Sequence, residues 1–279
     1  MKLLLLGASG FVGKHLAPAL RARGDEVVTA SLRDPAAAAS DATECDAIVN
    51  LAGEPLAQRW NARVKCRVEE SRVDAPRRFL DALAKLQRRC TRYVSASAVG
   101  YYGTSETETF DEESSPGSDF LARVCAGWER EARRAADLGM RVAIVRTGVA
   151  LGKDGGALEK LLPPFRAGMG GVVGSGRQWL SWIHIDDLVG IYLTALDRAQ
   201  GPLNACAPNP VTNSTFTKEL GAALNRPARV TVPTFVLRAM LGEGAEMLLH
   251  GQRVLPSRTE ALGYRFLFPE LKGALGNLL

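Results

Sequence analysis

The chain has 279 residues, 46% hydrophobic and 23% charged, which is long enough for a full α/β core with a smaller subdomain. Its 35 basic and 30 acidic residues are dispersed, and no stripe of basic and aromatic side chains indicates nucleic acid as a partner. Five cysteines without paired spacing argue against a disulfide framework or a metal site, and no apolar run approaches the length of a membrane span.

The first strand and the turn after it carry the clearest pattern. Residues 2–6, with four leucines, predict a strand buried on both faces, and a helix is expected over 12–23. Gly7 permits a tight turn, Gly10 lets backbone approach a pyrophosphate, and Gly13 lets the helix pack on the strand. The pattern predicts a dinucleotide site, although another tight strand-to-helix turn could use the same glycines.

A second strand is expected over 26–31, and its carboxyl end bears on the choice of cofactor. Arg33 favours the 2′-phosphate of NADP, with Ser31 as a further donor. Asp34, one residue on, keeps a contact to the 2′-OH of NAD open. A solvated loop is the structural alternative for Arg33.

The short alanine-rich segment 35–44 stands where a doubly wound fold usually has a third strand, so we expect that strand to be stunted or missing. A strand over 46–53 then ends in Ala52 and Gly53, whose small size would let a dinucleotide lie close to the backbone. A tight strand-to-loop turn is the alternative there.

Helical spacing extends over 60–86, with Pro76 marking a kink or a new helix start. Arg72 on this helix could reach a phosphate or a ribose, or it could belong to a solvated face. A strand over 93–97 places Ser97 at the sheet edge where open α/β sheets bind ligands. The acidic loop 104–119 is expected to be a solvated surface.

The later segments are expected to build the substrate side. A glycine-rich, hairpin-like stretch over 168–176 could cover a substrate. A helix opens near residue 185, with Asp186 or Asp187 expected as its N-cap, and Asn213 is expected to cap another. His184 is a possible proton donor, with a purely structural role as the alternative.

Several motifs occur together. They are Gly-Ala-Ser-Gly-Phe-Val-Gly at 7–13, Asn-Leu-Ala-Gly-Glu-Pro at 50–55, Ser-Arg-Val at 71–73, Ser-Ala-Val-Gly-Tyr-Tyr-Gly at 97–103, Trp-Glu at 128–129, Gly-Ser-Gly at 174–176 and Trp-Ile-His-Ile-Asp-Asp at 182–187. In this combination the chain resembles the epimerase-family proteins of the atypical, extended short-chain dehydrogenase/reductase superfamily. Residues 233–279 look like the uncharacterised C-terminal domain of that family.

The resemblance implies an α/β fold: a Rossmann-type doubly wound parallel sheet with a smaller C-terminal substrate-side subdomain. The NADP-binding core would comprise 1–165, with 183–207 returning to it. The substrate-side subdomain would comprise 166–182 and 208–279, of which 233–279 is the family's C-terminal domain. The resemblance also implies phosphate or ribose contacts from Ser31, Arg33 and Arg72 and backbone contacts around Leu51, Ala52 and Arg146. Together with the motif residues, the predicted NADP site is Gly7, Ser9, Gly10, Phe11, Val12, Gly13, Ser31, Arg33, Leu51, Ala52, Gly53, Arg72, Ser97 and Arg146.

One departure from the superfamily concerns its chemistry. The superfamily uses a Tyr-x-x-x-Lys pair in which the lysine helps the phenol to exchange a proton with the substrate. The corresponding window, 117–129, contains neither tyrosine nor lysine, and no tyrosine in the chain has a lysine four residues later.

Two functions therefore stay open. The first is an NADP-dependent oxidoreductase or epimerase-like enzyme acting on an unidentified small carbonyl or hydroxyl compound, with nucleotide sugars among the candidates. In it Ser97 would orient the substrate oxygen, and Tyr101, Tyr102 or His184 would donate the proton. The second is a catalytically silent NADPH-binding sensor or regulatory protein. We expect a cytoplasmic monomer or homodimer that binds neither nucleic acid nor membrane.

Overall fold

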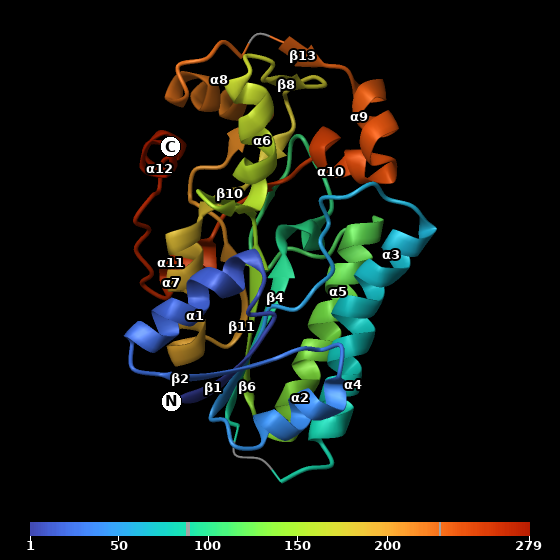
Figure 1. The fold of residues 1–279 in the computed structure, drawn as a ribbon, viewed down its shortest axis with the longest axis vertical. Helices are drawn as coiled ribbons and strands as arrows, with labels where there is room; N and C mark the ends of the chain where they lie inside the picture. Colours follow the sequence, from blue (N-terminus) through green and yellow to red (C-terminus); the bar gives the residue numbers. More distant parts are fainter. Residues whose placement is uncertain (88–89, 229) are drawn as a thin grey trace.

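The computed structural model describes residues 1–87, 90–228 and 230–279. At its centre lies a six-stranded sheet in the order β11-β6-β4-β3-β1-β2, with every neighbouring pair parallel (Figure 1). In chain order its strands are β1 (Lys2–Leu6), β2 (Glu26–Ala30), β3 (Ala47–Asn50), β4 (Arg92–Ala98), β6 (Arg141–Thr147) and β11 (Gly201–Ala205).

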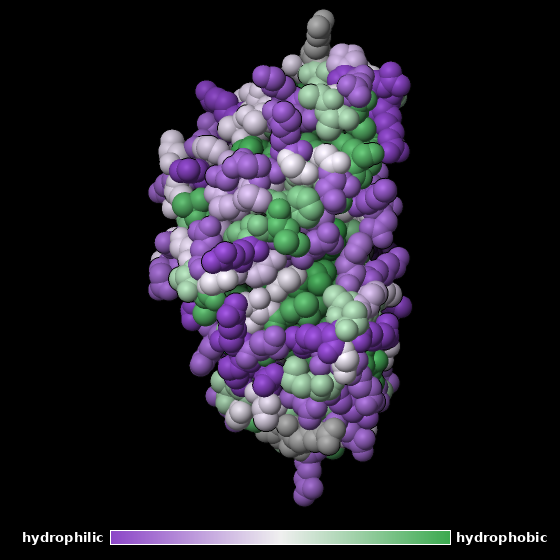
Figure 2. Space-filling view, turned by 90° about the vertical axis from the view of Figure 1, so that its left-hand side faces the viewer, coloured by the Kyte–Doolittle hydropathy of each residue, from purple (hydrophilic) through white to green (hydrophobic). Residues whose placement is uncertain are grey.

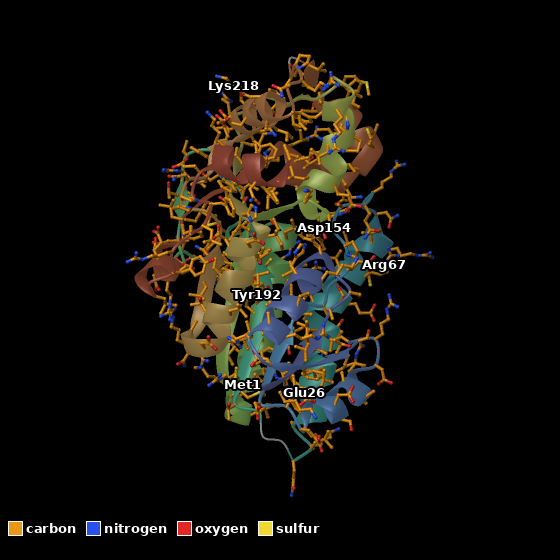
Figure 3. The ribbon with its side chains drawn as sticks, turned by 60° about the vertical axis from the view of Figure 1, so that its left-hand side comes forward. Met1, Glu26, Arg67, Asp154, Tyr192 and Lys218 are labelled. Carbon is orange, nitrogen blue, oxygen red and sulfur yellow. The ribbon has the colours of Figure 1, made fainter. Side chains whose placement is uncertain are left out.

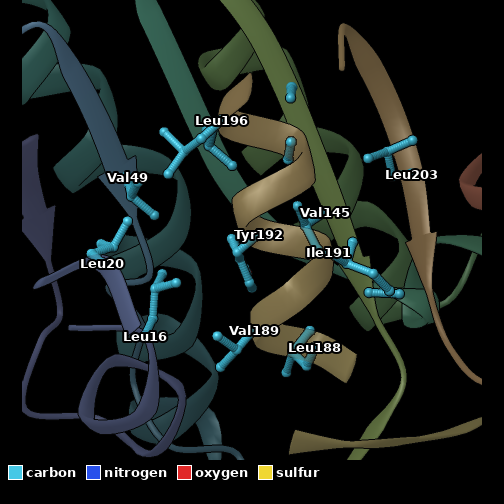
Figure 4. Close-up of a cluster of buried hydrophobic side chains, with 14 of the residues drawn as sticks. Leu16, Leu20, Val49, Val145, Leu188, Val189, Ile191, Tyr192, Leu196 and Leu203 are labelled. Carbon is cyan, nitrogen blue, oxygen red and sulfur yellow. The ribbon is translucent and has the colours of Figure 1, made fainter. Parts of the chain in front are cut away.

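Helices cover both faces of this sheet. Leu3 and Leu5 of β1 point into one core, against helices α1 (Phe11–Ala22) and α7 (Ile185–Arg198). The alternating Leu4 and Leu6 point into the other core, against α2 (Pro35–Ala42), α4 (Ala75–Leu83) and α5 (Phe120–Arg133). Figure 4 shows the first core, with Leu16 of α1 and Tyr192 of α7. The predicted Rossmann-type doubly wound sheet is therefore confirmed.

The segment between β2 and β3 forms a short helix rather than a strand. Asp34 caps α2 by accepting the N–H of Ala37 at 3.0 Å, and Pro35 begins the helix in a position where no amide donor is needed. Among the described residues, β2 therefore has β1 as its one neighbour and ends the sheet. This confirms that the third strand expected near this segment is missing.

The long helical segment after β3 is continuous but changes its winding. Helix α3 (Ala62–Glu69) passes into a π-helical turn, η1 (Glu70–Asp74), which passes into α4 with Pro76 in its first turn. Pro76 therefore marks the point where the π-helical turn passes into α4. Ser71 and Arg72 lie within the π-helical turn. This winding is rare in proteins, but where it occurs it is often at a functional site.

A second group of elements lies beyond the central sheet, with α6, α8 and α9 at the top of Figure 1. Within the described residues its two-stranded sheets are β7 (Val149–Gly152) with β10 (Trp182–His184), β8 (Gly171–Val173) with β13 (Val230–Val232), β9 (Trp179–Leu180) with β12 (Val211–Thr212), and β5 (Thr109–Phe110) with β14 (Arg253–Val254). The remaining helices are η2 (Val99–Tyr102), η3 (Arg134–Leu138), α6 (Gly156–Arg166), α8 (Asn213–Ala223), α9 (Thr234–Leu241), η4 (Glu243–Ala245), α10 (Glu246–Leu249), α11 (Ser257–Ala261) and α12 (Leu271–Leu278).

Three local expectations are wrong. The glycine-rich stretch is no hairpin, because β8 pairs in parallel with the distant β13. The acidic loop is not uniformly solvated, since Glu112 is 5% exposed and accepts the N–H groups of Asn204 and Arg258. Helix α8 is capped by Thr212, while the Asn213 side chain accepts the N–H of Val173. In each case the strand or side chain interacts with a residue distant in the chain, which the local sequence does not show.

The surface mixes hydrophilic and hydrophobic side chains over the face drawn in Figure 2. Of the helices in the described ranges, none is both long enough and apolar enough to cross a membrane. The most exposed large hydrophobic side chains include Phe235 and Met240, both on α9.

Candidate cofactor and reaction site

In the turn after β1 the backbone packs closely on itself and leaves N–H groups at the start of α1 exposed to a ligand. A Cβ on Gly13 would lie 2.5 Å from the carbonyl oxygen of Gly7, so a side chain there would force the turn apart. Gly7 has φ +82°, and the amide of Gly10 donates to the Gly7 carbonyl oxygen at 3.1 Å. Gly10 is the N-cap of α1 and makes no side-chain cap, so the first-turn N–H groups are available to an anion. The turn therefore fits a dinucleotide pyrophosphate.

A second loop borders this turn. A Cβ on Gly152 or on Gly155 would lie 2.4 Å from the ring of Phe11, so the two glycines let the loop after β7 close around that ring. Nε2 of His15 lies 2.9 Å from Oδ1 of Asp154 in the same loop, and Figure 3 labels Asp154 beside α1. Ser9 is exposed, whereas Val12 packs against the sheet core.

The carboxyl end of β2 favours a phosphate over a ribose hydroxyl. Asp34 is the residue that left NAD as an alternative cofactor in the sequence, and its side chain is used in capping α2. Arg33 is exposed, and its guanidinium has no ion pair within the described part of the chain. Its backbone N–H is held by the Ser31 hydroxyl oxygen at 3.2 Å. The loop therefore offers a free cation and a hydroxyl to an anion.

The end of β3 lies directly against the glycine turn. A Cβ on Gly7 would come within 2.9 Å of the Ala52 nitrogen and of the Leu51 carbonyl carbon, so these backbones touch. Asn50 organises this crossing, because its Oδ1 accepts the N–H of Ala52 at 3.1 Å and its Nδ2 donates to the Tyr93 hydroxyl at 3.2 Å. The strand therefore ends at a fixed height beside the predicted cofactor turn.

Arg72 reaches this strand end from the π-helical turn. Its guanidinium carbon would be 3.0 Å from a Cβ on Gly53, so the glycine makes room for it. Nη1 donates to the Glu54 carbonyl oxygen at 3.0 Å, and the guanidinium lies 5.2 Å from the ring of Trp128. Burial lowers the pKa of Arg72, and no carboxylate in the described residues forms an ion pair with it. An inner cation of this kind is suited to a phosphate or ribose.

Ser97 and Arg146, both predicted near the cofactor, belong to a buried network. The Ser97 hydroxyl donates to Oε1 of Glu129 at 2.8 Å, and Arg146 donates to both oxygens of the same carboxylate at 2.8 and 2.9 Å. Nη1 of Arg146 also donates to the Tyr102 hydroxyl at 2.9 Å, and that hydroxyl donates to Oδ1 of Asn204 at 2.6 Å. Burial lowers the pKa of Arg146, but the hydrogen bonds and charge of Glu129 raise it overall, so the guanidinium stays charged.

Among the proposed proton donors, Tyr101 and Tyr102 differ sharply. Tyr102 is 3% exposed, its hydroxyl has both partners named above, and burial raises its pKa. Tyr101 is partly exposed, and its hydroxyl makes no hydrogen bond within the described residues. Its ring lies 3.6 Å from the Arg146 guanidinium carbon and edge-on to Tyr102. Tyr101 therefore keeps a hydroxyl that a substrate can reach.

His184 lies in a different environment. It is the N-cap of α7: its Nδ1 accepts the N–H of Asp186 at 3.1 Å, which corrects the expectation that Asp186 or Asp187 caps this helix. Its Nε2 lies 3.2 Å from Oδ1 of Asn277, and its ring stacks on Phe268 at 3.9 Å. Burial lowers its pKa. Nδ1 is thus used in capping α7, and Nε2 in contacting Asn277 of α12.

The helix that should carry the missing tyrosine and lysine is α5. A Cβ on Gly100 would lie 3.5 Å from Leu121 and 4.0 Å from Cys125, so these two side chains face the turn that holds Tyr101. Burial raises the pKa of the Cys125 thiol to about 12, so it stays protonated at neutral pH. Leu121 and Cys125, which face this turn, therefore supply no acid or base for neutral pH.

The Trp128-Glu129 motif is visible in the sequence, but no role for Glu129 was predicted from it. The part that Asn204 plays in the buried network was not predicted either. A signal for Glu129 existed, since it stands on the same helical stripe as the buried Ala122 and Cys125, where an unpaired carboxylate is costly. Asn204 lay in a strand with no such signal. The structure collects the remaining predicted cofactor residues at the carboxyl ends of β1, β2 and β3, whereas His184 stands at the start of α7 against Phe268 and Asn277.

The doubly wound sheet and the glycine turn define a dinucleotide-binding protein of the Rossmann type. The chain belongs to the NAD dependent epimerase/dehydratase family, whose model matches residues 3–206. Residues 232–278 match a domain of unknown function, DUF1731. The division of the chain at residue 165 stays a prediction.

Named relatives extend over the whole chain. It is 42% identical over 295 residues to the mouse epimerase family protein SDR39U1, covering 100% of both chains. It is 43% identical over 298 residues to the chloroplastic SDR39U1 homolog of Arabidopsis thaliana, covering 99% of this chain and 86% of the relative.

Solved structures show the same fold. Human SDR39U1 isoform 2, solved with NADPH, is 40% identical and superimposes with a TM-score of 0.93 over 100% of this chain and 99% of that one. The UDP-glucose 4-epimerase of Thermotoga maritima, solved with UDP-glucose, has a TM-score of 0.83 over 99% of this chain and 96% of that one. Since it is 16% identical, it shows a shared fold alone.

Proposed function

We propose that this chain binds NADPH at the β1 turn and is an NADP-dependent oxidoreductase for a small carbonyl or hydroxyl compound. The observation that carries the proposal is the close-packed glycine turn, whose uncapped helix start suits a pyrophosphate. The free Arg33, beside an Asp34 already used as a helix cap, supports NADP over NAD. The NADPH in the human relative's structure supports the same cofactor.

Binding is tested by titrating the purified protein with NADPH and with NADH and following nicotinamide fluorescence. NADPH should bind at least about tenfold more tightly, because the 2′-phosphate gains a charge-assisted hydrogen bond. Equal affinities would remove the argument from Arg33. If neither NADPH nor NADH binds, a structural scaffold that uses no cofactor is favoured instead.

Tyr101 is the proton donor that the geometry supports best. The hydroxyls of Tyr102 and Ser97 and both nitrogens of His184 already have protein partners, whereas the Tyr101 hydroxyl has none within the described residues. When NADPH is bound, it supplies a hydride. The Tyr101 hydroxyl would hold the substrate oxygen and give it a proton as the carbonyl carbon becomes reduced.

The reaction is tested by incubating the protein with NADPH and a broad panel of aldehydes, ketones and keto sugars. Substrate-dependent loss of nicotinamide absorbance is expected, and Tyr101→Phe should lower kcat by about a hundredfold or more. Tyr102→Phe is the matched control, since it removes a hydroxyl already engaged with Arg146 and Asn204. Unchanged kcat in Tyr101→Phe would reject Tyr101 as the donor.

A catalytically silent NADPH-binding sensor is the second candidate. It is favoured by the Ser97 hydroxyl, which is turned toward Glu129, and by the Leu121 and Cys125 side chains on the neighbouring face of α5. Tight NADPH binding with no turnover of any compound in the panel would support it. Whether a nucleotide sugar is the substrate, whether the protein is a monomer or homodimer, and whether it is cytoplasmic stay predictions.

A further inference from the structure

The Glu129–Arg146 ion pair is almost completely buried, and the proposed binding of NADPH does not by itself require it. Glu129 is 0% and Arg146 2% exposed, and two parallel N–H···O bonds join them. A buried ion pair contributes little net stability, because desolvation of the two charges offsets most of their attraction. The groups that surround the pair therefore bear more on its role than its contribution to stability does.

The in-plane donors of Arg146 are directed at protein acceptors. Nε and Nη2 donate to Glu129, and Nη1 donates to the Tyr102 hydroxyl and to the Glu112 carbonyl oxygen. The faces of the guanidinium are a separate resource, because a flat cation also stacks on aromatic rings. The ring of Tyr101 lies at 3.6 Å from the guanidinium carbon, closer than the ring of Tyr102 at 5.1 Å.

The charge around Glu129 is not balanced one to one. Arg133 donates to Oε2 of Glu129 at 2.8 Å, so two guanidinium groups share one carboxylate. Glu112, which is also buried nearby, directs its carboxylate at the backbone N–H groups of Asn204 and Arg258 instead. The bonds that Arg146 donates to Glu129 lie in the plane of its guanidinium and leave the flat face of that group to the Tyr101 ring.

We propose that Arg146, stacked on Tyr101, replaces the missing lysine in assisting proton transfer from the phenol. As the hydroxyl gives up its proton, negative charge spreads into the aromatic ring, and its attraction for the guanidinium grows. An interaction that strengthens along the reaction lowers the barrier, whereas one of constant strength does not. Glu129 is a positioning residue, because its two hydrogen bonds fix the plane of the guanidinium under the ring.

The step balances without a further reactant. During reduction of a carbonyl, a C–H bond forms with the hydride that NADPH carries, and an O–H bond forms as the Tyr101 O–H bond breaks. The products are an alcohol, NADP⁺ and the Tyr101 phenolate, which lies above Arg146. The phenolate then regains a proton from water. This inference rests on the proposed function, because it takes Tyr101 as the proton donor.

The test measures the Tyr101 ring itself and needs neither substrate nor NADPH. An aryl sulfonyl fluoride reacts with the phenolate form of tyrosine, and mass spectrometry of the digested protein gives the labelling rate of each tyrosine. Tyr264 is the internal reference, since burial and the charge of Asp187 raise its pKa. Tyr101 should be labelled fastest of the five tyrosines of the chain.

Two variants then separate the cation from the fold. Arg146→Lys keeps a charge that can pair with Glu129 but loses the flat group, and labelling of Tyr101 should fall about three- to tenfold. Arg146→Met combined with Glu129→Met removes both buried charges together and leaves only the half-exposed Arg133 without its carboxylate, and labelling should fall at least as far. Hydroxyl-radical footprinting of the same ring serves as the control, because it reports exposure regardless of ionisation.

The outcomes distinguish this inference from the proposed function. Unchanged labelling in folded Arg146→Lys, with unchanged footprinting, overturns the inference even if Tyr101→Phe abolishes reduction. Reduced labelling supports it even if no substrate is found in the carbonyl panel. If the double variant fails to fold, the lysine variant decides alone.

Discussion

Arg33 and Asp34 are neighbours at the end of β2, yet their side chains do different things. Asp34 caps α2, whereas Arg33 is free to meet a 2′-phosphate. Arg33→Asp should therefore weaken NADPH binding by about tenfold or more, since a charge-assisted hydrogen bond is lost and a like charge is added. NADH binding should change by less than about threefold. Fluorescence titrations with both nucleotides measure the difference.

Arg21→Asp is the matched control, because Arg21 is an exposed arginine in the last turn of α1, at the other end of the helix from the glycine turn. It makes the same change in net charge and should leave both affinities close to wild type, since exposed charges farther apart than a Debye length are largely screened. Equal weakening of NADPH and NADH in Arg33→Asp would show that Arg33 does not recognise the 2′-phosphate.

Gly13 is the residue at which the glycine turn is least tolerant. Its replacement by alanine would put a Cβ 2.5 Å from the Gly7 carbonyl oxygen and 2.7 Å from Cα of Ala8. Both neighbours are backbone, so Gly13→Ala should lower stability by about 1–3 kcal/mol. It should also weaken NADPH binding by tenfold or more in titration, because the turn must open.

Gly276→Ala gives the opposite expectation for the same chemical change. Gly276 lies inside α12, and nothing stands within 4 Å of the Cβ it would gain. Alanine there should raise the free energy of unfolding by about 0.5–1 kcal/mol through helix propensity. Similar NADPH affinities in the two variants would mean that the tight turn is not the binding site.

Single residues of the predicted site were accessible to sequence reasoning only where the local pattern carries the chemistry. The spacing of Gly7, Gly10 and Gly13 predicts a close backbone approach that the structure contains. The partnership of Glu129 with Arg146 joins residues 17 positions apart on different elements, so no local pattern encodes it. Tertiary packing decides which carboxylates meet which guanidiniums.

The α7 start shows how an element depends on a group that local propensity would not choose. His184 caps the helix through Nδ1, and this requires the neutral ring, because a protonated Nδ1 cannot accept the Asp186 N–H. Burial lowers the pKa of His184 in the folded state. Aspartate is the commoner cap, but Asp187 instead accepts the N–H groups of Leu267 and Phe268, which local sequence could not reveal.

This cap makes stability depend on pH in a definite direction. Because the folded pKa lies below that of an unfolded histidine, about 6.5, the unfolded chain binds the proton more readily. The stability that neutral His184 provides is fully present above pH 6.5 and is lost as the pH falls toward the folded pKa. His184→Asn keeps a capping oxygen without titrating, so its melting temperature should fall less than that of wild type between pH 7.5 and 5.

His250→Gln provides the comparison, since it removes an exposed histidine that lies outside the α7 cap. Differential scanning fluorimetry across this range is sufficient, because the slope matters and not the absolute stability. Identical slopes for wild type and His184→Asn would exclude His184 as a titrating group.

Elements with strong periodicity were predictable, and short ones that need distant partners were not. The four leucines of β1 and the expected absence of a third strand are both confirmed, because burial and segment length are local properties. Strands β8 and β13 are three residues each and pair across nearly 60 positions, so the sequence around β8 looked like a hairpin. Pairing over such distances is fixed by the packed molecule.

At the scale of the whole molecule, Trp60 joins the sheet side to the C-terminal segment. Its backbone N–H donates to the Leu241 carbonyl oxygen at 2.9 Å, and a Cβ on Gly244 would lie 2.9 Å from its indole. The loop before it is tied to the proposed cofactor site, because the Glu54 carbonyl oxygen accepts from Arg72. A continuous set of contacts therefore runs from Arg72 to α9 and η4.

These contacts predict that NADPH slows hydrogen exchange in residues 234–245. A ligand held by Arg72 opposes local opening of the 54–60 loop, and any opening of α9 that begins by releasing Trp60 becomes rarer. Helix α12, which packs on α8 and makes no contact with Trp60, should change less when exchange is measured by mass spectrometry. Trp60→Ala keeps the backbone bond to Leu241 but removes the indole contact with Gly244, so it should reduce the difference, and its cavity should lower stability by about 3–5 kcal/mol. If NADPH instead protects α9 and α12 equally, the ligand stabilises the molecule globally and Trp60 transmits nothing specific.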